Sequence, residues 1–305
     1  MPLLHLLLAL AIVVIWGTNF VVIKWGLAEL PPFALAALRF ALSSLPFLPF
    51  IRRPAVPWRT LAAFGLLLGV GQFGLLFLAM RGDISPGLAS LVIQVQVFFT
   101  VGMAMARGGE RVTPLQVLAC GLAVAGMAVI ASHANDTVAA GVVAVSLRGL
   151  ALVLVAALCW AAANLVARSA GRIDALGFMV WSSLFAAPPL AAISLLFEGG
   201  PAHVGTAVLA ASPAAWATVA WQAVGNTLFG YGCWNWLLAR HDAATVAPMA
   251  LGVPVFGMAA SAWALGEALP VWKLAAALLV MSGLALNLWA ARRKALGRPV
   301  GARPA

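Results

Sequence analysis

Charged residues are scarce in this sequence. They make up 9% of its 305 residues, whereas apolar residues make up 64%. An ordinary soluble domain is about 25% charged and about 45–50% apolar. So few charges do not coat the surface of a soluble 31.5 kDa protein, and so little polarity does not fit a disordered chain. The composition therefore predicts a protein embedded in a lipid bilayer.

Residues that carry catalysis are also scarce. All Asp and Glu residues fall in loops or at the ends of apolar runs, and there is neither a Walker A motif nor a pair of His residues with metal-ligand spacing. The three cysteines lie scattered in apolar runs and form no disulfide framework. These absences argue against ATP-driven and metal-dependent chemistry. We therefore expect a protein that is not an enzyme and that holds no metal and no other cofactor.

Basic residues outnumber acidic ones by 18 to 8. They stand singly or in pairs at the ends of apolar runs, without the interleaved aromatic residues of a motif that reads RNA or DNA. We therefore expect no nucleic-acid partner. The preference of cytoplasmic loops for Lys and Arg explains the basic excess instead.

Ten apolar runs, bounded by charged residues, Pro and Gly, have lengths close to the ~20 residues that cross a bilayer. The sequence thus predicts an all-α integral membrane protein with ten transmembrane helices. Thirteen Lys and Arg residues fall on one side of these spans and four on the other, which places both termini in the cytoplasm. The runs cover residues 3–28, 33–51, 60–80, 86–106, 114–132, 147–168, 175–197, 213–239, 243–265 and 270–291.

The two halves of the sequence share residue spacings. Trp16 and Lys24 are eight positions apart, as are Trp160 and Arg168. Because each half then holds five spans, an odd number, the second copy must be inverted relative to the first, as in many transporters. The expected divisions are a first repeat over residues 1–137, a second repeat over residues 138–291 and a basic cytoplasmic tail over residues 292–305.

Several short motifs connect the sequence with a known family. They are Trp16-Gly17-Thr18-Asn19-Phe20-Val21-Val22-Ile23-Lys24, Pro31-Pro32, Leu38-Arg39-Phe40, Pro86-Gly87-Leu88-Ala89-Ser90-Leu91-Val92, Gly230-Tyr231-Gly232 and Val253-Pro254-Val255. With these motifs the chain resembles the EamA family of the drug/metabolite transporter superfamily, up to about residue 291. The resemblance implies two inverted five-helix repeats around a central cavity, in the inner membrane of a bacterium. It is strongest to exporters of O-acetylserine and cysteine, and it implies protons as the coupling ion.

Polar and aromatic side chains within the spans are the candidates for lining that cavity. An amide in hydrocarbon costs a few kcal/mol unless it is paired or faces water, so such amides should point inward. Gln94 and Gln96 lie about 200° apart on an α-helix and are not expected to share one narrow face. For any single aromatic residue, ordinary helix packing is the alternative. The candidate substrate-binding residues are Trp16, Asn19, Phe20, Lys24, Arg39, Gln72, Phe73, Gln94, Gln96, Phe99, Trp160, Asn164, Tyr231, Trp234 and Asn235.

Lys24 and Arg39 are the two basic residues that fall well inside spans. Either could hold a substrate carboxylate, which an Arg would bind through two hydrogen bonds. The alternatives are structural: Arg39 would bond loop carbonyls or Glu29, and Lys24 would extend outward to the interface.

Pro248 and Pro254 in the ninth run are hinge candidates, because a proline interrupts the hydrogen bonding of a helix. Static helix curvature is the alternative. Glu110 and Glu267 each precede the last run of their half, and we expect them to cap those two helices through the helix dipole.

The predicted function is export of a small polar metabolite by alternating access. A zwitterion suits a cavity with cations and amides and no buried acid, since its ammonium can rest on amides and aromatic faces. The resemblance makes amino acids of the cysteine pathway the expected substrates. The alternatives are an exporter of other amino acids or drugs, a facilitator without proton coupling, an integral membrane lipid enzyme and a non-transporting scaffold. The missing acid and His clusters argue against the enzyme, and amides in several spans argue against the scaffold.

Overall fold

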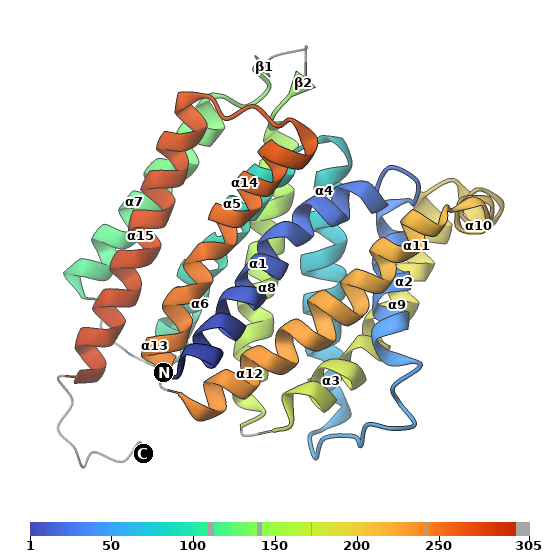
Figure 1. Cartoon of the computed structure of the whole chain (residues 1–305), viewed down its shortest axis with the longest axis horizontal. Helices are drawn as coiled ribbons and strands as arrows, with labels where there is room; N and C mark the ends of the chain where they lie inside the picture. The colour runs from blue at the N-terminus through green and yellow to red at the C-terminus, as the bar shows by residue number, and fades with distance from the viewer. Residues whose placement is uncertain (109–112, 139–141, 172, 242, 297–305) are drawn as a thin grey trace.

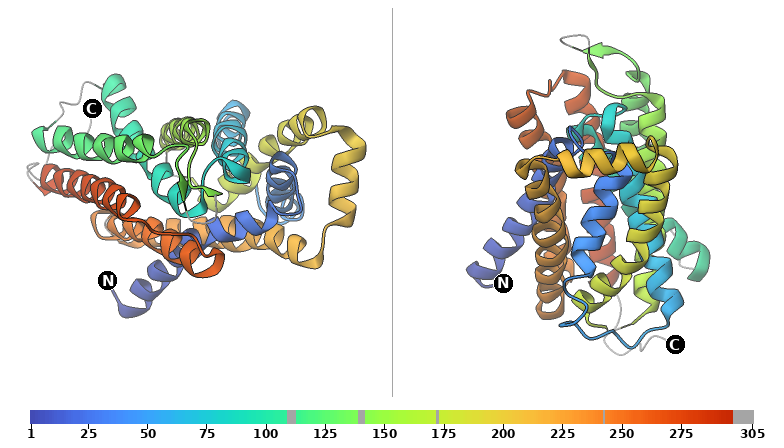
Figure 2. Two further views of the ribbon diagram at one scale, coloured as in Figure 1. Left: turned by 90° about the horizontal axis from the view of Figure 1, so that it is seen from above. Right: turned by 90° about the vertical axis from the view of Figure 1, so that its right-hand side faces the viewer.

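The computed structural model describes residues 1–108, 113–138, 142–171, 173–241 and 243–296. Its helices run side by side in a bundle (Figure 1 and Figure 2), and α15 ends at the same end of the bundle at which α1 begins. Two short strands, β1 (Thr137–Val138) and β2 (Val142–Val143), form an antiparallel hairpin that the sequence did not predict.

Helical segments follow one another along both halves of the chain. Those of the first half are α1 (Leu3–Gly26), α2 (Pro32–Ser44), α3 (Trp58–Gly65), the π-helical segment η1 (Leu66–Gly74), α4 (Leu75–Gly82), α5 (Pro86–Val92), the 3₁₀ segment η2 (Ile93–Val95), α6 (Gln96–Gly108) and α7 (Pro114–Ser132). Those of the second half are α8 (Leu147–Ser169), α9 (Ala175–Phe197), α10 (Gly200–Ala210), α11 (Pro213–Ala220), the π-helical segment η4 (Trp221–Phe229), α12 (Gly230–Arg240), α13 (Ala243–Val246), the 3₁₀ segment η5 (Ala247–Leu251), α14 (Gly252–Leu265) and α15 (Val271–Leu296).

Eight helices in the described ranges are long and apolar enough to cross a membrane. A ninth span results if α10 and the helix that follows it, which are bent by 96° relative to each other, count as one. With 13 residues, α2 is shorter than the ~20 residues of a typical span. The predicted class, a helical protein with many spans, is confirmed, whereas the count of ten stays a prediction. The eight are Leu3–Gly26, Trp58–Gly82, Pro86–Ala106, Pro114–Ser132, Leu147–Ser169, Ala175–Phe197, Ala247–Leu265 and Val271–Arg293.

Two helix boundaries differ from the sequence prediction. The second apolar run extends to residue 51, but α2 already ends at Ser44 and turns follow it. The reason is Pro46, because proline lacks an amide hydrogen and its ring clashes with the preceding turn of a helix. The additional helix α10 begins after Gly199, whose φ of 89° lets the chain turn sharply after α9.

The long helices of residues 58–82 and 213–240 contain α-helical and π-helical segments in the same order. Each consists of eight α-helical residues, then nine π-helical residues, and then a return to α-helix. Segments of π-helix are rare and frequently occur at functional sites. The two segments η1 and η4 therefore mark where a site is to be sought.

Four acidic residues connect the two halves at one end of the bundle, which we call the acidic end. In each case an acid that follows a helix of one half bonds the start of a helix in the other half. The amides of Phe33 and Ala34 in α2 donate to Glu198 at 2.9 and 3.2 Å, and Ser212 donates to Glu29 through its amide and its hydroxyl. These two bonds from Ser212 lower the pKa of Glu29. The four acids are Glu29, Asp83, Glu198 and Glu267.

Glu267 makes the most contacts of the four. It accepts hydrogen bonds from the Ser85 hydroxyl at 2.5 Å, from the Gly87 amide at 2.9 Å and from the Ser261 hydroxyl, and it pairs with Lys273 at 2.8 Å. Burial alone raises the pKa of Glu267, but Lys273 and the donated hydrogen bonds outweigh burial and lower it. The carboxylate thus caps α5, which lies in the other half, and not α15 as expected from the sequence. The corresponding prediction for Glu110 lies outside the described residues.

Candidate functional site

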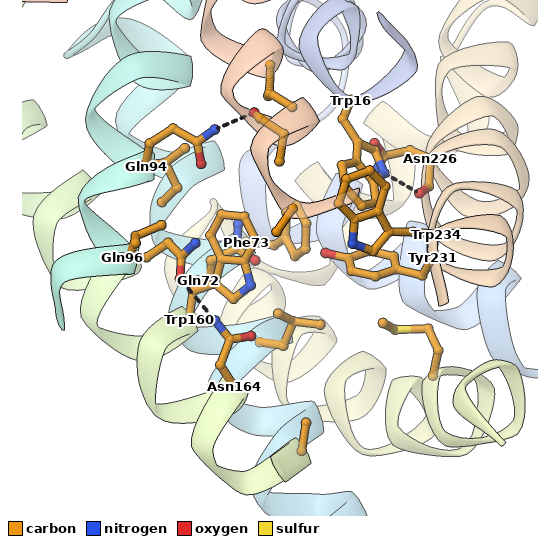
Figure 3. Close-up of a pocket in the computed structure, with 18 of the residues that line it drawn as sticks. Trp16, Gln72, Phe73, Gln94, Gln96, Trp160, Asn164, Asn226, Tyr231 and Trp234 are labelled. Atoms are coloured by element: carbon orange, nitrogen blue, oxygen red, sulfur yellow. Dashed lines mark hydrogen bonds between the residues drawn. The ribbon is translucent and has the colours of Figure 1, made fainter. Parts of the chain in front are cut away.

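A cavity of about 590 Å³ lies within the bundle and is lined by residues of both halves (Figure 3). Its lining includes Gly171 and Ile173, in the loop between α8 and α9. That loop lies at the end of the bundle where α1 begins, opposite the acidic end (Figure 1). No residue of the described acidic-end loops lines the cavity. The cavity therefore reaches one end of the bundle, while the bonds of the four acids tie the halves together at the other. Its volume is typical of a small-molecule site.

Most of the residues predicted from the sequence meet in this cavity. The lining residues among them are Trp16, Asn19, Phe20, Gln72, Phe73, Gln94, Gln96, Trp160, Asn164, Tyr231 and Trp234.

One wall of the cavity is aromatic. The ring centroid of Trp16 lies 5.3 Å from that of Tyr231 and 5.1 Å from that of Trp234, so α1 and α12 meet through these rings (Figure 3). The indole nitrogen of Trp16 donates to the backbone oxygen of Asn226, in η4, at 3.3 Å. This bond fixes the orientation of the Trp16 ring against the π-helical segment.

The other wall carries amides. Asn164 donates through Nδ2 to Oε1 of Gln96 at 2.9 Å, and Gln94 donates through Nε2 to the Ala250 oxygen at 3.5 Å (Figure 3). Gln94 and Gln96 both line the cavity. Gln94 lies in the 3₁₀ segment η2 and Gln96 is the first residue of α6, so the expectation that they do not share one narrow face stays a prediction.

Two further lining amides have unused bonding capacity. Asn19 and Gln72 are each 3% exposed, and their oxygens, Oδ1 and Oε1, are buried with no hydrogen-bond partner among the described residues. A buried amide that lacks a partner costs about 1–3 kcal/mol. A bound ligand with complementary polar groups would remove that cost.

Lys24 does not line the cavity. Its amino group donates to the backbone oxygens of Met80 and Arg81, at 3.0 and 3.1 Å, near the end of α4. A cation at this position satisfies helix-terminal carbonyls and complements the helix dipole.

Arg39 does not line the cavity either, and no part of it is exposed. Its Nε and Nη2 both donate to the hydroxyl of Thr227 in η4, at 3.2 and 2.9 Å. Its guanidinium carbon lies 3.6 Å from the ring centroid of Phe73 in η1. Arg39 thus connects the two π-helical segments in a fully buried environment. The hydrogen bonds of Arg39 in the described chain go to Thr227, and not to Glu29 or the loop carbonyls considered from the sequence.

The remaining candidates lie elsewhere. Phe99 packs against the hydrophobic core and is absent from the cavity lining, and the side chain of Asn235 lies outside the described part of the chain. Pro248 is the second residue of η5 and Pro254 the third residue of α14. The flanking residues Ala247 and Val253 line the cavity, so the two prolines border the site without forming its surface.

Some lining residues were not among the candidates. Asn226 lines the cavity, as do Phe64, Phe178 and Met179. For Asn226 a signal existed, because it is an amide within an apolar run. The other three have no sequence signal that separates them from residues of an apolar core.

The cavity is uncharged as far as the structure describes it. Its lining contains amides, aromatic rings and aliphatic side chains, and no Asp, Glu, Lys, Arg or His. Within the same ranges, no three His, Cys, Asp or Glu residues come together as metal ligands would. Such a surface suits a small molecule held by hydrogen bonds and ring contacts.

Comparison with known proteins agrees with this architecture. The chain is 38% identical over 300 residues to a probable amino-acid metabolite efflux pump of Salmonella typhimurium, with 96% of this chain and 98% of the relative covered. It is 37% identical over 294 residues to a protein of the same name in Escherichia coli, with 95% and 96% covered. A solved crystal structure superimposes with a TM-score of 0.61 at 20% identity, covering 95% of this chain and 99% of the other, which shows a shared fold.

The family assignment follows from a match to a family model that covers most of the chain. The model of the EamA-like transporter family matches residues 3–132 and again residues 147–289. Together with the eight apolar helices, this match makes the chain a multi-pass protein of the inner membrane. The chain belongs to the EamA-like transporter family.

Proposed function

We propose that this protein exports small zwitterionic metabolites, in particular O-acetylserine and cysteine, from the cytoplasm by alternating access. The observation that carries the proposal is the uncharged cavity with an amide wall facing an aromatic wall. The names of the two relatives, amino-acid metabolite efflux pumps, support the same substrate class.

The two walls suit the two ends of an amino acid. An ammonium group is attracted to the faces of Trp rings, which Trp16 and Trp234 supply. The amides of Asn19 and Gln72 offer both donors and acceptors to a polar side chain. A lipophilic cation would instead favour a carboxylate in the cavity, and none lines it in the described chain. This difference supports amino acids over cationic drugs.

The position of the cavity suits the state that faces the cytoplasm. The bias of Lys and Arg assigns the end where α1 begins to the cytoplasm, and the cavity reaches that end at Gly171. The bonds of the four acids would then close the outer end. In this proposal, export requires those bonds to break while the opposite end closes.

The proposal includes ten spans in two inverted repeats, residues 1–137 and 138–291. The matching series of eight α-helical and nine π-helical residues in both halves supports a repeat, and so do the two separate matches of the family model. In this arrangement α2 is a short span, α10 lies along the outer surface, and α11 to α12 form the eighth span.

Counterflow in liposomes tests the proposed function. Purified protein is reconstituted with unlabelled O-acetylserine inside, and entry of labelled cysteine, O-acetylserine, threonine and an aromatic amino acid is measured with and without a proton gradient. We expect entry of the first two compounds above the other two. The variant Asn164→Leu, at a lining amide, should lower entry. The matched variant Asn287→Leu, at a buried amide outside the lining, should not.

The outcomes separate the alternatives. Entry of lipophilic dyes but of none of the amino acids would contradict the proposal and favour a drug exporter. Equal entry with and without a gradient would identify a facilitator. No entry of any compound, from protein that stays folded, would contradict transport of these metabolites.

A further inference from the structure

Arg39 is a buried cation that has no counter-ion among the described residues. It has no exposed surface, and its Nη1 has no hydrogen-bond partner in the described part of the chain. The ion pairs found in that part join Arg148 with Asp83 and Lys273 with Glu267, and neither pair includes Arg39. Because an uncompensated charge within a membrane protein costs several kcal/mol, a fold that retains one points to a role in function.

The guanidinium lies next to the substrate cavity without lining it. Phe73 is the separating side chain: its ring lines the cavity and also lies 3.6 Å from the guanidinium carbon. Tyr231, a second lining residue, is close enough to Arg39 to interact with it electrostatically. The positive charge therefore acts on this part of the cavity wall, and at short range.

We propose that Arg39 makes the cavity selective for substrates that carry a carboxylate, which lies against the wall formed by Phe73 and Tyr231. The inference rests on the proposed function, since it assigns one end of the zwitterion to this wall. The ammonium end then points toward the rings of Trp16 and Trp234. Nη1 supplies a hydrogen bond when the Phe73 ring turns aside.

The size of the effect follows from the distance. A carboxylate on the far side of the Phe73 ring would lie ~7 Å from the guanidinium, and at an effective dielectric constant of about 20 the attraction changes affinity roughly 50-fold. Thr227 holds the guanidinium in place through two hydrogen bonds. The selectivity thus needs no charged group on the cavity surface itself.

The test compares two competitors in the counterflow assay, cysteine and cysteinamide, which differ in the carboxylate and keep the ammonium. The measured quantity is the ratio of their inhibition constants. In the parent protein we expect cysteine to compete at least about 10-fold better. In Arg39→Gln the ratio should fall toward one, whereas Arg39→Lys should keep part of it. A ratio in Arg39→Gln equal to that of the parent overturns the inference.

Two further variants keep the test decisive if Arg39→Gln does not fold. Phe73→Leu leaves Arg39 in place and removes the separating ring, so the ratio should increase about threefold or more; an unchanged ratio contradicts the inference. Lys24→Gln removes a cation that bonds backbone carbonyls outside the cavity, and it should leave the ratio unchanged. A ratio lowered by Lys24→Gln as much as by Arg39→Gln would show an effect of net charge alone.

If the proposed function itself is wrong, the counterflow assay gives a different result. In that case the parent protein shows no counterflow of cysteine or O-acetylserine, and no ratio exists to compare. Counterflow in the parent with a ratio near one leaves amino-acid export in place and overturns the role of Arg39.

Discussion

Replacing Glu267 by Gln should destabilise the protein far more than a comparable change at another acid of the same end. The side chains of Glu267 and Lys273 are 8% and 1% exposed, and their charged atoms lie 2.8 Å apart. Removing one partner of a buried ion pair costs about 3–5 kcal/mol, because the other charge stays buried. For a chain of this size each kcal/mol lowers Tm by about 2 °C. We therefore expect Glu267→Gln to lower the Tm of the purified protein by about 6–10 °C.

Asp83→Asn is the matched control. Asp83 also bonds the start of a helix in the other half, at Ser146, but its partner Arg148 lies 3.7 Å away and has a side chain that is 68% exposed. A solvent-exposed pair contributes at most about 1 kcal/mol, so Tm should fall by less than ~2 °C. Equal losses in the two variants would refute the argument from burial.

The variant Glu267→Gln should also differ from the parent in how its Tm depends on pH. The folded-state pKa of Glu267 lies below its ordinary value of 4.5, so its stabilisation is fully present above that value and is lost as pH falls through the lowered pKa. Between neutral pH and acid pH, the Tm of the parent should therefore fall more than that of Glu267→Gln. Parallel curves for the two proteins would show that Glu267 is not ionised in the folded state.

Three further predictions concern the acidic end, Lys24 and the topology. Gly87→Ala would place a methyl group 2.9 Å from Oε1 of Glu267, so it should lower Tm by an amount that corresponds to about 1–3 kcal/mol. In the double variant with Glu267→Gln, the loss of Tm should be smaller than the sum of the two single losses. Lys24→Gln loses two hydrogen bonds to backbone oxygens and should lower Tm by a few degrees while leaving the counterflow KM for cysteine unchanged. Reporter fusions should alternate in location along the chain, and two adjacent loops on one side would contradict the ten-span topology. The informative fusion sites are Arg59 and Arg240 for the cytoplasm and Glu29 and Glu198 for the outside.

The helices were largely predictable, because the bilayer imposes both the length and the apolarity of a span. The runs 114–132 and 175–197 coincide with α7 and α9. Helix α2 ends early, at Ser44. Pro46 indicates this end in the sequence, but the apolar run continues past it, so hydropathy alone predicts a longer helix. The π-helical segments had none, because they depend on a shift of backbone hydrogen bonds and not on residue type.

The site was predictable where the sequence shows a polar or aromatic group in an apolar run. Gln72, Asn164 and Trp160 line the cavity for that reason. Lys24 and Arg39 gave the same signal, but their positions depend on partners far along the chain. Arg39 bonds Thr227, which is 188 residues away. Such a contact depends on how the helices pack, and the local sequence pattern carries no information about that packing.

In the proposed export cycle, the cavity takes up substrate from the cytoplasm. Ala167 lines the cavity toward the end where α1 begins, so a cysteine at this position reports access directly. In a chain with Cys120, Cys159 and Cys233 replaced, Ala167→Cys should react with a membrane-impermeant thiol reagent in inside-out vesicles, and O-acetylserine should slow that reaction. Reaction only in right-side-out vesicles, or a rate that O-acetylserine does not change, would contradict uptake from the cytoplasm into this cavity.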